Sequence, residues 1–134
     1  MYVKQRFQTD CGVACLAMLA NVPWEVAEFA IDTATPWKWR KYSTNTKQIR
    51  LAAKLLDLDT DQNRLVTLKS DEDLWTQVPD NSLVKIPKSG TSQWHWVVFR
   101  NGKIYDPSWG VYKVDKYSRN PSSYMEFYDN GYYN

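Results

Sequence analysis

The chain has 134 residues, a formal net charge of +2 and 43% hydrophobic residues. This length supports one domain with one hydrophobic core and leaves no room for a second. The basic residues are scattered along the chain, which argues against nucleic acid as the main partner, because nucleic acid needs a concentrated basic face. Seven Trp and nine Tyr are many for this length, so aromatic side chains should supply much of the buried area.

Targeting signals are missing from the printed sequence. Residues 1–6 contain no apolar stretch of the kind found in secretory signals. No segment has the roughly 20 consecutive apolar residues that span a bilayer. We therefore expect a cytoplasmic protein with no membrane partner, and a monomer.

Residues 13–20 are apolar without exception (VACLAMLA), which predicts a helix buried on every side. Cys11 would lie in the first turn of this helix. There, unpaired backbone N–H groups and the positive end of the helix dipole favour a thiolate. Thr9 or Asp10 is expected to cap the helix. Cys11 is therefore a candidate nucleophile.

The two cysteines, Cys11 and Cys15, are expected to remain free thiols. Four residues apart on a helix, their Cβ atoms would be about 5–6 Å apart. A disulfide needs roughly 3.5–4.5 Å, so a bridge between them is not expected. Together with His95, the single histidine, they leave a tetrahedral zinc site one ligand short. We expect no metal and no other cofactor.

Two more helices are predicted, at residues 24–31 and 46–58. The second carries apolar side chains at positions i, i+3, i+4 and i+7, the pattern of an amphipathic helix. The polar connection at residues 32–44 holds Trp37 and Trp39. These side chains either contact substrate or pack against the domain, and Trp37 is retained as a candidate substrate contact.

The second half of the chain predicts an antiparallel sheet of roughly four to six strands. Alternating apolar residues bounded by turn residues indicate strands at residues 64–68, 82–87, 93–100, 103–107 and 111–114. Ser70 should begin a short helix. Asn101-Gly102 is a strong signal for a two-residue hairpin turn. In the strand before this turn, alternation places His95 on one face and Trp94 and Trp96 on the other.

The predicted hairpin returns Asp106 toward His95. Cys11, His95 and Asp106 then occur in the chain order of a thiol triad, in which the imidazole takes the thiol proton and a third polar group orients the ring. Taken alone, His95 could equally be a buried histidine satisfied by backbone. Asp106 alone could be a turn opener before Pro107.

Two sequence blocks carry these residues. The first is Asp10–Met18 (DCGVACLAM), with Gln5 six residues before Cys11, and the second comprises residues 95–99 (HWVVF) and 106–110 (DPSWG). Together they resemble the papain-like cysteine peptidases, most closely the branch that processes bacteriocin precursors after a double-glycine leader. The resemblance extends from about Gln5 to Gly110.

The resemblance implies an α+β, papain-like fold in which a central, nucleophile-bearing helix packs against an antiparallel sheet. By position, Cys11 would be the nucleophile, His95 the base and Asp106 the group that orients the base. Gln5 would donate a side-chain hydrogen bond to the oxyanion, with Gln8 as a rival for that role.

Three further residues are expected to lie near the thiol and to contact the substrate. Gly12 would allow close backbone approach beside the thiol, and the backbone N–H of Cys11 would be the second oxyanion donor. Trp94 and Trp96, which flank the candidate base, are expected to contact the substrate.

The predicted domain covers residues 1–114, and residues 115–134 form a Tyr-rich segment that is either packed or mobile. The expected activity is that of a thiol hydrolase that cleaves a peptide or amide bond of a peptide or protein substrate through a thioester. The printed sequence contains no exporter, so a double-glycine substrate is not assured. Acyl transfer by the same triad, or a catalytically silent binding module, are the alternatives.

Overall fold

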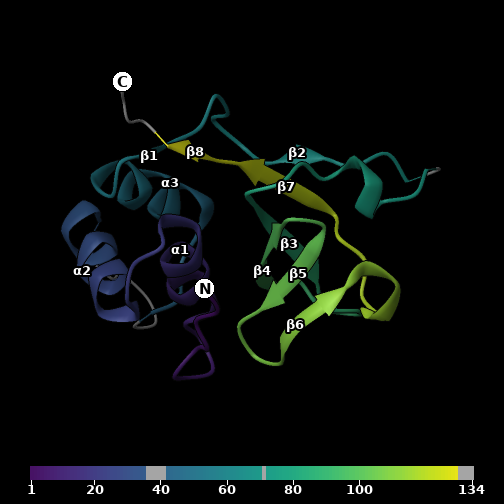
Figure 1. Cartoon of the computed structure of the whole chain (residues 1–134), viewed down its shortest axis with the longest axis horizontal. Coiled ribbons are helices and arrows are strands. Elements are labelled where there is room, and N and C mark those ends of the chain that lie inside the picture. The colour runs from purple at the N-terminus through teal and green to yellow at the C-terminus, as the bar shows by residue number, and fades with distance from the viewer. Residues whose placement is uncertain (36–41, 71, 130–134) are drawn as a thin grey trace.

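A computed structural model of the chain describes residues 1–35, 42–70 and 72–129. Three helices lie on one side of the molecule and a twisted antiparallel sheet on the other, so the predicted α+β class is confirmed (Figure 1). The described helices are α1 (Cys11–Ala20), α2 (Trp24–Ala34) and α3 (Thr46–Leu55). None of them alone is long and apolar enough to cross a membrane. α1 and α2 reach that length only as a pair bent by 108°.

The main sheet has the strand order β2-β7-β3-β4-β5-β6 in the described part of the chain, and every pairing in it is antiparallel. Its strands are β2 (Val66–Thr67), β3 (Ser82–Pro87), β4 (Trp94–Arg100), β5 (Lys103–Asp106), β6 (Gly110–Lys113) and β7 (Ser123–Glu126). A separate two-stranded pairing joins β1 (Leu58–Asp59) to β8 (Tyr128–Asp129).

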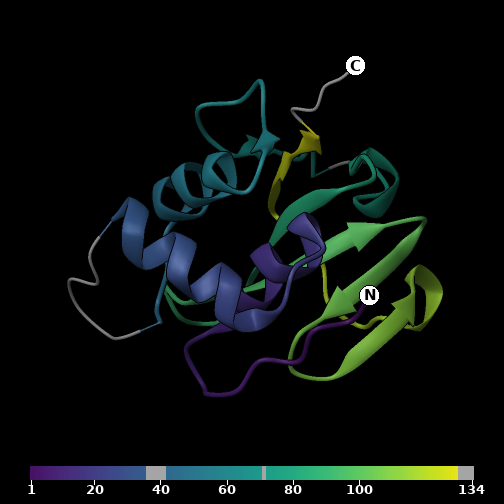
Figure 2. The same ribbon diagram turned by 60° about the vertical axis from the view of Figure 1, so that its left-hand side comes forward.

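Helix α1 lies in the middle of the molecule, between α2 and the strand β4 (Figures 1 and 2). Its residues from Gly12 to Leu19 are all buried, as the apolar run predicted. Trp96 and Val98 pack on the α1 side of the sheet, whereas Val97 and Phe99 belong to the core on the other face. The predicted alternation along β4 is confirmed for these four residues.

The β4–β5 hairpin has the predicted turn. Asn101 and Gly102 both have positive φ, 53° and 71°, as a two-residue hairpin turn that matches strand twist requires. Arg100 pairs with Lys103 across this turn. The register therefore carries Asp106 back along β4 toward the end of the strand that holds His95.

Three predicted helices differ from the structure, and the first of them, α2, runs three residues beyond its predicted end to Ala34. α3 ends at Leu55 because Asp57 takes a left-handed conformation (φ 62°), after which Leu58 pairs in β1. The helix expected after Ser70 is a single 3₁₀ turn at Trp75–Gln77. The Gln77 side chain bonds both backbone groups of Lys69, which folds this segment back on itself in place of a longer helix.

The Tyr-rich C-terminal segment contributes to the sheet. β7 lies between β2 and β3, and it pairs with both of them. Met125 and Phe127 are buried in the same core as α1. Residues 115–129 are therefore packed as part of the fold. The boundary at residue 114 stays a prediction.

Candidate active site

Three side chains that are distant in sequence meet at the N-terminus of α1. Cys11 is the first residue of that helix, His95 is the second residue of β4, and Asp106 ends β5. His95 Nε2 lies 2.8 Å from Asp106 Oδ1. The Cys11 side chain lies near enough to the His95 ring to raise the pKa of the imidazole. Because Nε2 is used by Asp106, Nδ1 is the ring nitrogen that remains for the thiol.

The contacts of His95 favour its charged form. Burial alone would lower the pKa of His95, whose exposed fraction is 8%. The interactions with Asp106 and Cys11 outweigh burial and raise the pKa to about 9. An imidazolium here can neutralise a thiolate on one side and a carboxylate on the other.

Asp106 is fully buried, and both of its carboxylate oxygens are hydrogen-bonded. Oδ1 accepts from His95 and from the Ser108 backbone N–H at 2.8 Å, while Oδ2 accepts from the Tyr117 hydroxyl at 2.7 Å. The Tyr2 hydroxyl donates to the Asp106 backbone carbonyl at 2.6 Å. Burial opposes the charge of Asp106, but the bonds to His95 and Tyr117 hold the pKa of its carboxyl below the usual value.

Tyr117 and Tyr2 are neighbours of the site that the sequence did not reveal. Tyr117 lies in the Tyr-rich C-terminal segment, where no periodic pattern distinguishes one tyrosine from another. Burial and the contact with Asp106 raise the pKa of Tyr117 far above its ordinary value, so its hydroxyl stays a donor to the carboxylate. The high tyrosine content predicted buried aromatic area and assigned none of these tyrosines to the site.

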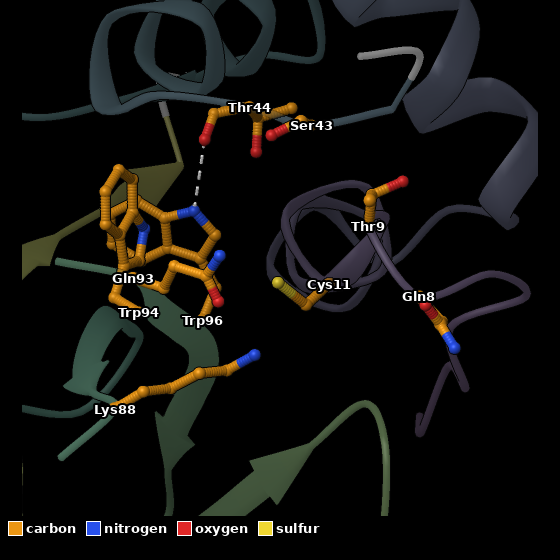
Figure 3. A pocket seen from close by; sticks show the side chains of 9 residues that line it. All are labelled: Gln8, Thr9, Cys11, Ser43, Thr44, Lys88, Gln93, Trp94 and Trp96. Carbon is orange, nitrogen blue, oxygen red and sulfur yellow. Dashed lines mark hydrogen bonds between the residues drawn. The ribbon is translucent and has the colours of Figure 1, made fainter. Parts of the chain in front are cut away.

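Gln5 is tied to the turn that follows Asp106. Its backbone N–H donates to the Pro107 carbonyl at 2.9 Å, and its side-chain Oε1 accepts from the Ser108 hydroxyl at 2.8 Å. Its Nε2 donates to the Phe7 carbonyl at 2.7 Å. Gln8 lines the cavity beside Cys11 but is exposed, and its side chain points away from the Cys11 sulfur in Figure 3.

A cavity of about 260 Å³ opens beside Cys11 (Figure 3). Trp94, which is 36% exposed, and Trp96, which is buried, line one wall, so the structure places both predicted contacts at this cavity. Trp37 lies outside the described residues. The remaining lining residues are Gln8, Thr9, Ser43, Thr44, Lys88 and Gln93.

The profile of the Peptidase C39 family matches residues 1–118 of the chain. The chain belongs to this family. The family consists of papain-like cysteine peptidases of the bacteriocin-processing type, so the predicted resemblance, the papain-like fold and membership among the hydrolases are confirmed. No curated protein sequence matches the chain.

Gly12 serves this C39-family fold by letting another segment approach α1. A Cβ at this position would collide with the Thr44 hydroxyl and press on the Ile49 side chain. Glycine therefore allows the segment before α3 to lie against the first turn of the nucleophile helix. The space beside Gly12 is thus filled by Thr44 of the same fold, and the predicted approach of a substrate at Gly12 stays a prediction.

Asp10 has a different task from the predicted helix cap. It occupies the N-cap position of α1 but makes no capping bond to the helix. Its buried carboxylate instead accepts from the backbone N–H groups of Arg6 and Phe7, both at 2.8 Å, and from Trp24 Nε1 at 2.7 Å. Asp10 therefore joins the N-terminal segment to α2 just before the cysteine.

The two cysteines are free and differ in accessibility. Cys11 is partly exposed, whereas Cys15 is fully buried, and burial raises the pKa of the Cys15 thiol well above its ordinary value. Among the residues that the structure describes, no group of three His, Cys, Asp or Glu side chains is placed to hold a metal ion.

Proposed function

We propose that this cysteine peptidase cleaves a peptide or amide bond of a peptide or protein substrate with Cys11 as nucleophile, His95 as acid and base, and Asp106 as the group that orients His95. The supporting observation is the His95 ring, which bonds the Asp106 carboxylate and whose pKa is also raised by the nearby Cys11 side chain. The accessible cavity beside Cys11 gives a substrate a route to the thiol.

The proposed reaction has two halves. His95 accepts the Cys11 proton, and the thiolate attacks the substrate carbonyl carbon to form a tetrahedral intermediate. The imidazolium then protonates the amine as the C–N bond breaks, which leaves an acyl thioester on Cys11. In the second half, His95 takes a proton from water, the hydroxide attacks the thioester, and the acid leaves with regeneration of the thiol.

The negative oxygen of the intermediate needs two donors. The backbone N–H of Cys11 at the start of α1 is one, and we assign the side-chain amide of Gln5 as the other. The Gln5 amide nitrogen carries two hydrogens, of which the bond to Phe7 uses one. Its anchoring to Ser108 also fixes this amide beside the turn that carries Asp106, whereas Gln8 points away from the sulfur.

Replacing Gln5 by Ala should lower kcat about 10²–10³-fold, the usual effect of removing one oxyanion donor. Gln8→Ala is the matched control, because Gln8 is the same residue type on the same segment, and its kcat should stay close to that of the unaltered protein. Steady-state kinetics on a cleaved peptide measures both. The reverse ranking of the two variants would assign the oxyanion role to Gln8.

The experiment that tests the proposed function is a peptide-library cleavage profile read by mass spectrometry. The unaltered protein should cleave a subset of the library, Cys11→Ala should cleave none of it, and Cys15→Ala should keep the same subset. Cleavage that survives Cys11→Ala would contradict the proposal. If an added amine appears in the products in place of water, the same triad works as an acyl transferase.

A further inference from the structure

One wall of the cavity beside Cys11 is positively charged. Lys88 lines the cavity, and its ammonium group points into it in Figure 3. Lys85 is not a lining residue, but its Nζ lies 4.6 Å from the centre of the ring of Trp94, which is one. Two cations thus flank the aromatic surface that borders the nucleophile.

No carboxylate balances these charges within the described ranges 1–35, 42–70 and 72–129. The lining of the cavity contains no Asp and no Glu. The two ion pairs found in these ranges, Arg6–Glu25 and His95–Asp106, involve neither lysine. Both ammonium groups are therefore available to an anionic partner.

The connection between β3 and β4 holds the Lys88 backbone in place. The Lys88 N–H donates to the Gln93 carbonyl at 3.0 Å. The Lys88 carbonyl accepts from the Thr91 hydroxyl at 3.0 Å and from the Thr91 N–H at 3.2 Å. This closed loop anchors the base of the Lys88 side chain at the rim of the cavity, which reduces the entropy that a contact with substrate would cost.

The opposite side of the cavity holds a buried hydroxyl without a partner. Thr44 is 8% exposed, and its Oγ1 makes no hydrogen bond in the part of the chain that the structure describes. Figure 3 shows Thr44 and Lys88 on either side of the space between Cys11 and Trp96. The Oγ1 atom itself lies against Gly12 and is covered by the first turn of α1, so Thr44 shapes this wall without offering a donor to the cavity.

We propose that this cavity is a subsite for an acidic residue of the substrate, adjacent to the bond that Cys11 cleaves. Lys88 pairs with the substrate carboxylate, Lys85 adds to the positive potential, and the Trp94 ring packs against the carbon stem. The inference rests on the proposed function, because it takes Cys11 as the nucleophile.

The most direct test uses two alkylating reagents that differ in charge, iodoacetate and iodoacetamide. Their rate ratio at Cys11 reports the potential inside the cavity without any knowledge of the substrate. Lys88→Glu should lower the iodoacetate-to-iodoacetamide ratio about three- to tenfold, and added salt should reduce the difference. Lys103→Glu, the same charge change at the far end of the β4–β5 hairpin, is the matched control and should leave the ratio unchanged.

A second test uses pairs of peptides that differ only in Asp against Asn, or Lys against Gln, near the cleaved bond. The unaltered protein should show a lower KM for the Asp peptide at one position, and Lys88→Glu should reverse this preference in favour of the Lys peptide.

The two proposals fail in different ways. If Lys88→Glu leaves both the reagent ratio and the peptide preference unchanged while Cys11 remains reactive, the acidic subsite is wrong and the thiol peptidase stands. If Cys11 reacts with neither reagent faster than a free thiol and no peptide is cleaved, the proposed function fails, and the subsite fails with it.

Discussion

At the scale of single residues, the two carboxylate oxygens of Asp106 have separate partners. Oδ1 accepts hydrogen bonds from His95 and the Ser108 N–H, whereas Oδ2 accepts one from the Tyr117 hydroxyl. Rotation of this carboxylate would break hydrogen bonds at both oxygens, so its partners hold it in one orientation. Tyr117 therefore positions Asp106, and through it the ring of His95.

We expect Tyr117→Phe to lower kcat about tenfold with little change in KM. Hydrogen bonds to charged groups contribute about 1.5–3 kcal/mol, and 1.4 kcal/mol corresponds to a factor of ten in rate. Tyr112→Phe is the matched control, because the Tyr112 ring packs 5.6 Å from that of Tyr117 without touching Asp106. Equal kcat values for the two variants would show that Tyr117 has only a packing role.

The proton on His95 should limit activity at high pH. In the proposed reaction, protonated His95 supplies the proton that the leaving amine needs, and the pKa of His95 is raised to about 9. The rate constant kcat/KM should therefore fall as pH rises through about 9. A pH–rate profile measures this limb, and a fall centred near the ordinary histidine value of 6.5 would contradict the assignment.

The free energy of unfolding should fall at high pH as His95 loses the same proton. Because the folded pKa of His95 lies above its unfolded value of 6.5, the stabilisation is complete below pH 6.5 and is lost as pH rises through about 9. Urea unfolding at pH 6 and pH 9.5 should show this loss, and His95→Gln should reduce it. A loss of equal size in His95→Gln would assign the effect to other groups.

At the scale of elements, Asp10 links three parts of the chain that surround the nucleophile. Asp10 lies immediately before α1. Its carboxylate accepts hydrogen bonds from two backbone N–H groups of the N-terminal segment and from the Trp24 indole of α2. These bonds set the path by which the N-terminal segment, including Gln5, reaches the site.

Asp10→Asn should lower the free energy of unfolding by about 1–3 kcal/mol. An amide has one acceptor oxygen, so at least one of the three donors loses its partner, and the oxygen that is replaced by NH2 brings a donor against a donor. Asp57→Asn is the control, since Asp57 is exposed and left-handed, a conformation that Asn tolerates well. Urea unfolding measures both variants. A change below 0.5 kcal/mol in Asp10→Asn would contradict the role described for this carboxylate.

Local signals account for the elements that the sequence predicted well. The apolar run of α1, the Asn101-Gly102 turn and the alternation in β4 act over a few residues, so they can be read without the fold. α3 ended early because Asp57 is left-handed and the next two residues, Leu58 and Asp59, pair with Asp129 and Tyr128 near the C-terminus. Such a pairing depends on a distant strand and leaves no mark in the local pattern.

At the scale of the whole molecule, the C-terminal segment completes both the core and the site. β7 lies inside the main sheet, and Tyr117 precedes it by a short connection. The alignment of Cys11, His95 and Asp106 followed from the two family-like blocks. The contacts of Tyr117, Thr44 and Asp10 could not be predicted from the sequence, because each depends on which distant part of the backbone passes beside it.

Met125→Ala, in the middle of β7, should therefore reduce the free energy of unfolding by about 2–5 kcal/mol, the range for such truncations in a core. Met125 is fully buried against the α1 core, whereas its neighbour Glu126 is exposed. Glu126→Ala should change the stability by less than about 0.5 kcal/mol. Chemical denaturation measures both. Similar values for the two variants would mean that β7 is not an interior strand.

The central claim is that His95 activates Cys11 at the N-terminus of α1. Its most direct test is the rate of alkylation of Cys11 and Cys15 by iodoacetamide, followed by mass spectrometry between pH 5 and 8. Cys11 should react faster than a free thiol at the acidic end of this range, lose that advantage in His95→Ala, and leave Cys15 unlabelled while the protein is folded. A Cys11 that reacts no faster than a free thiol, or equally fast in His95→Ala, would contradict the account.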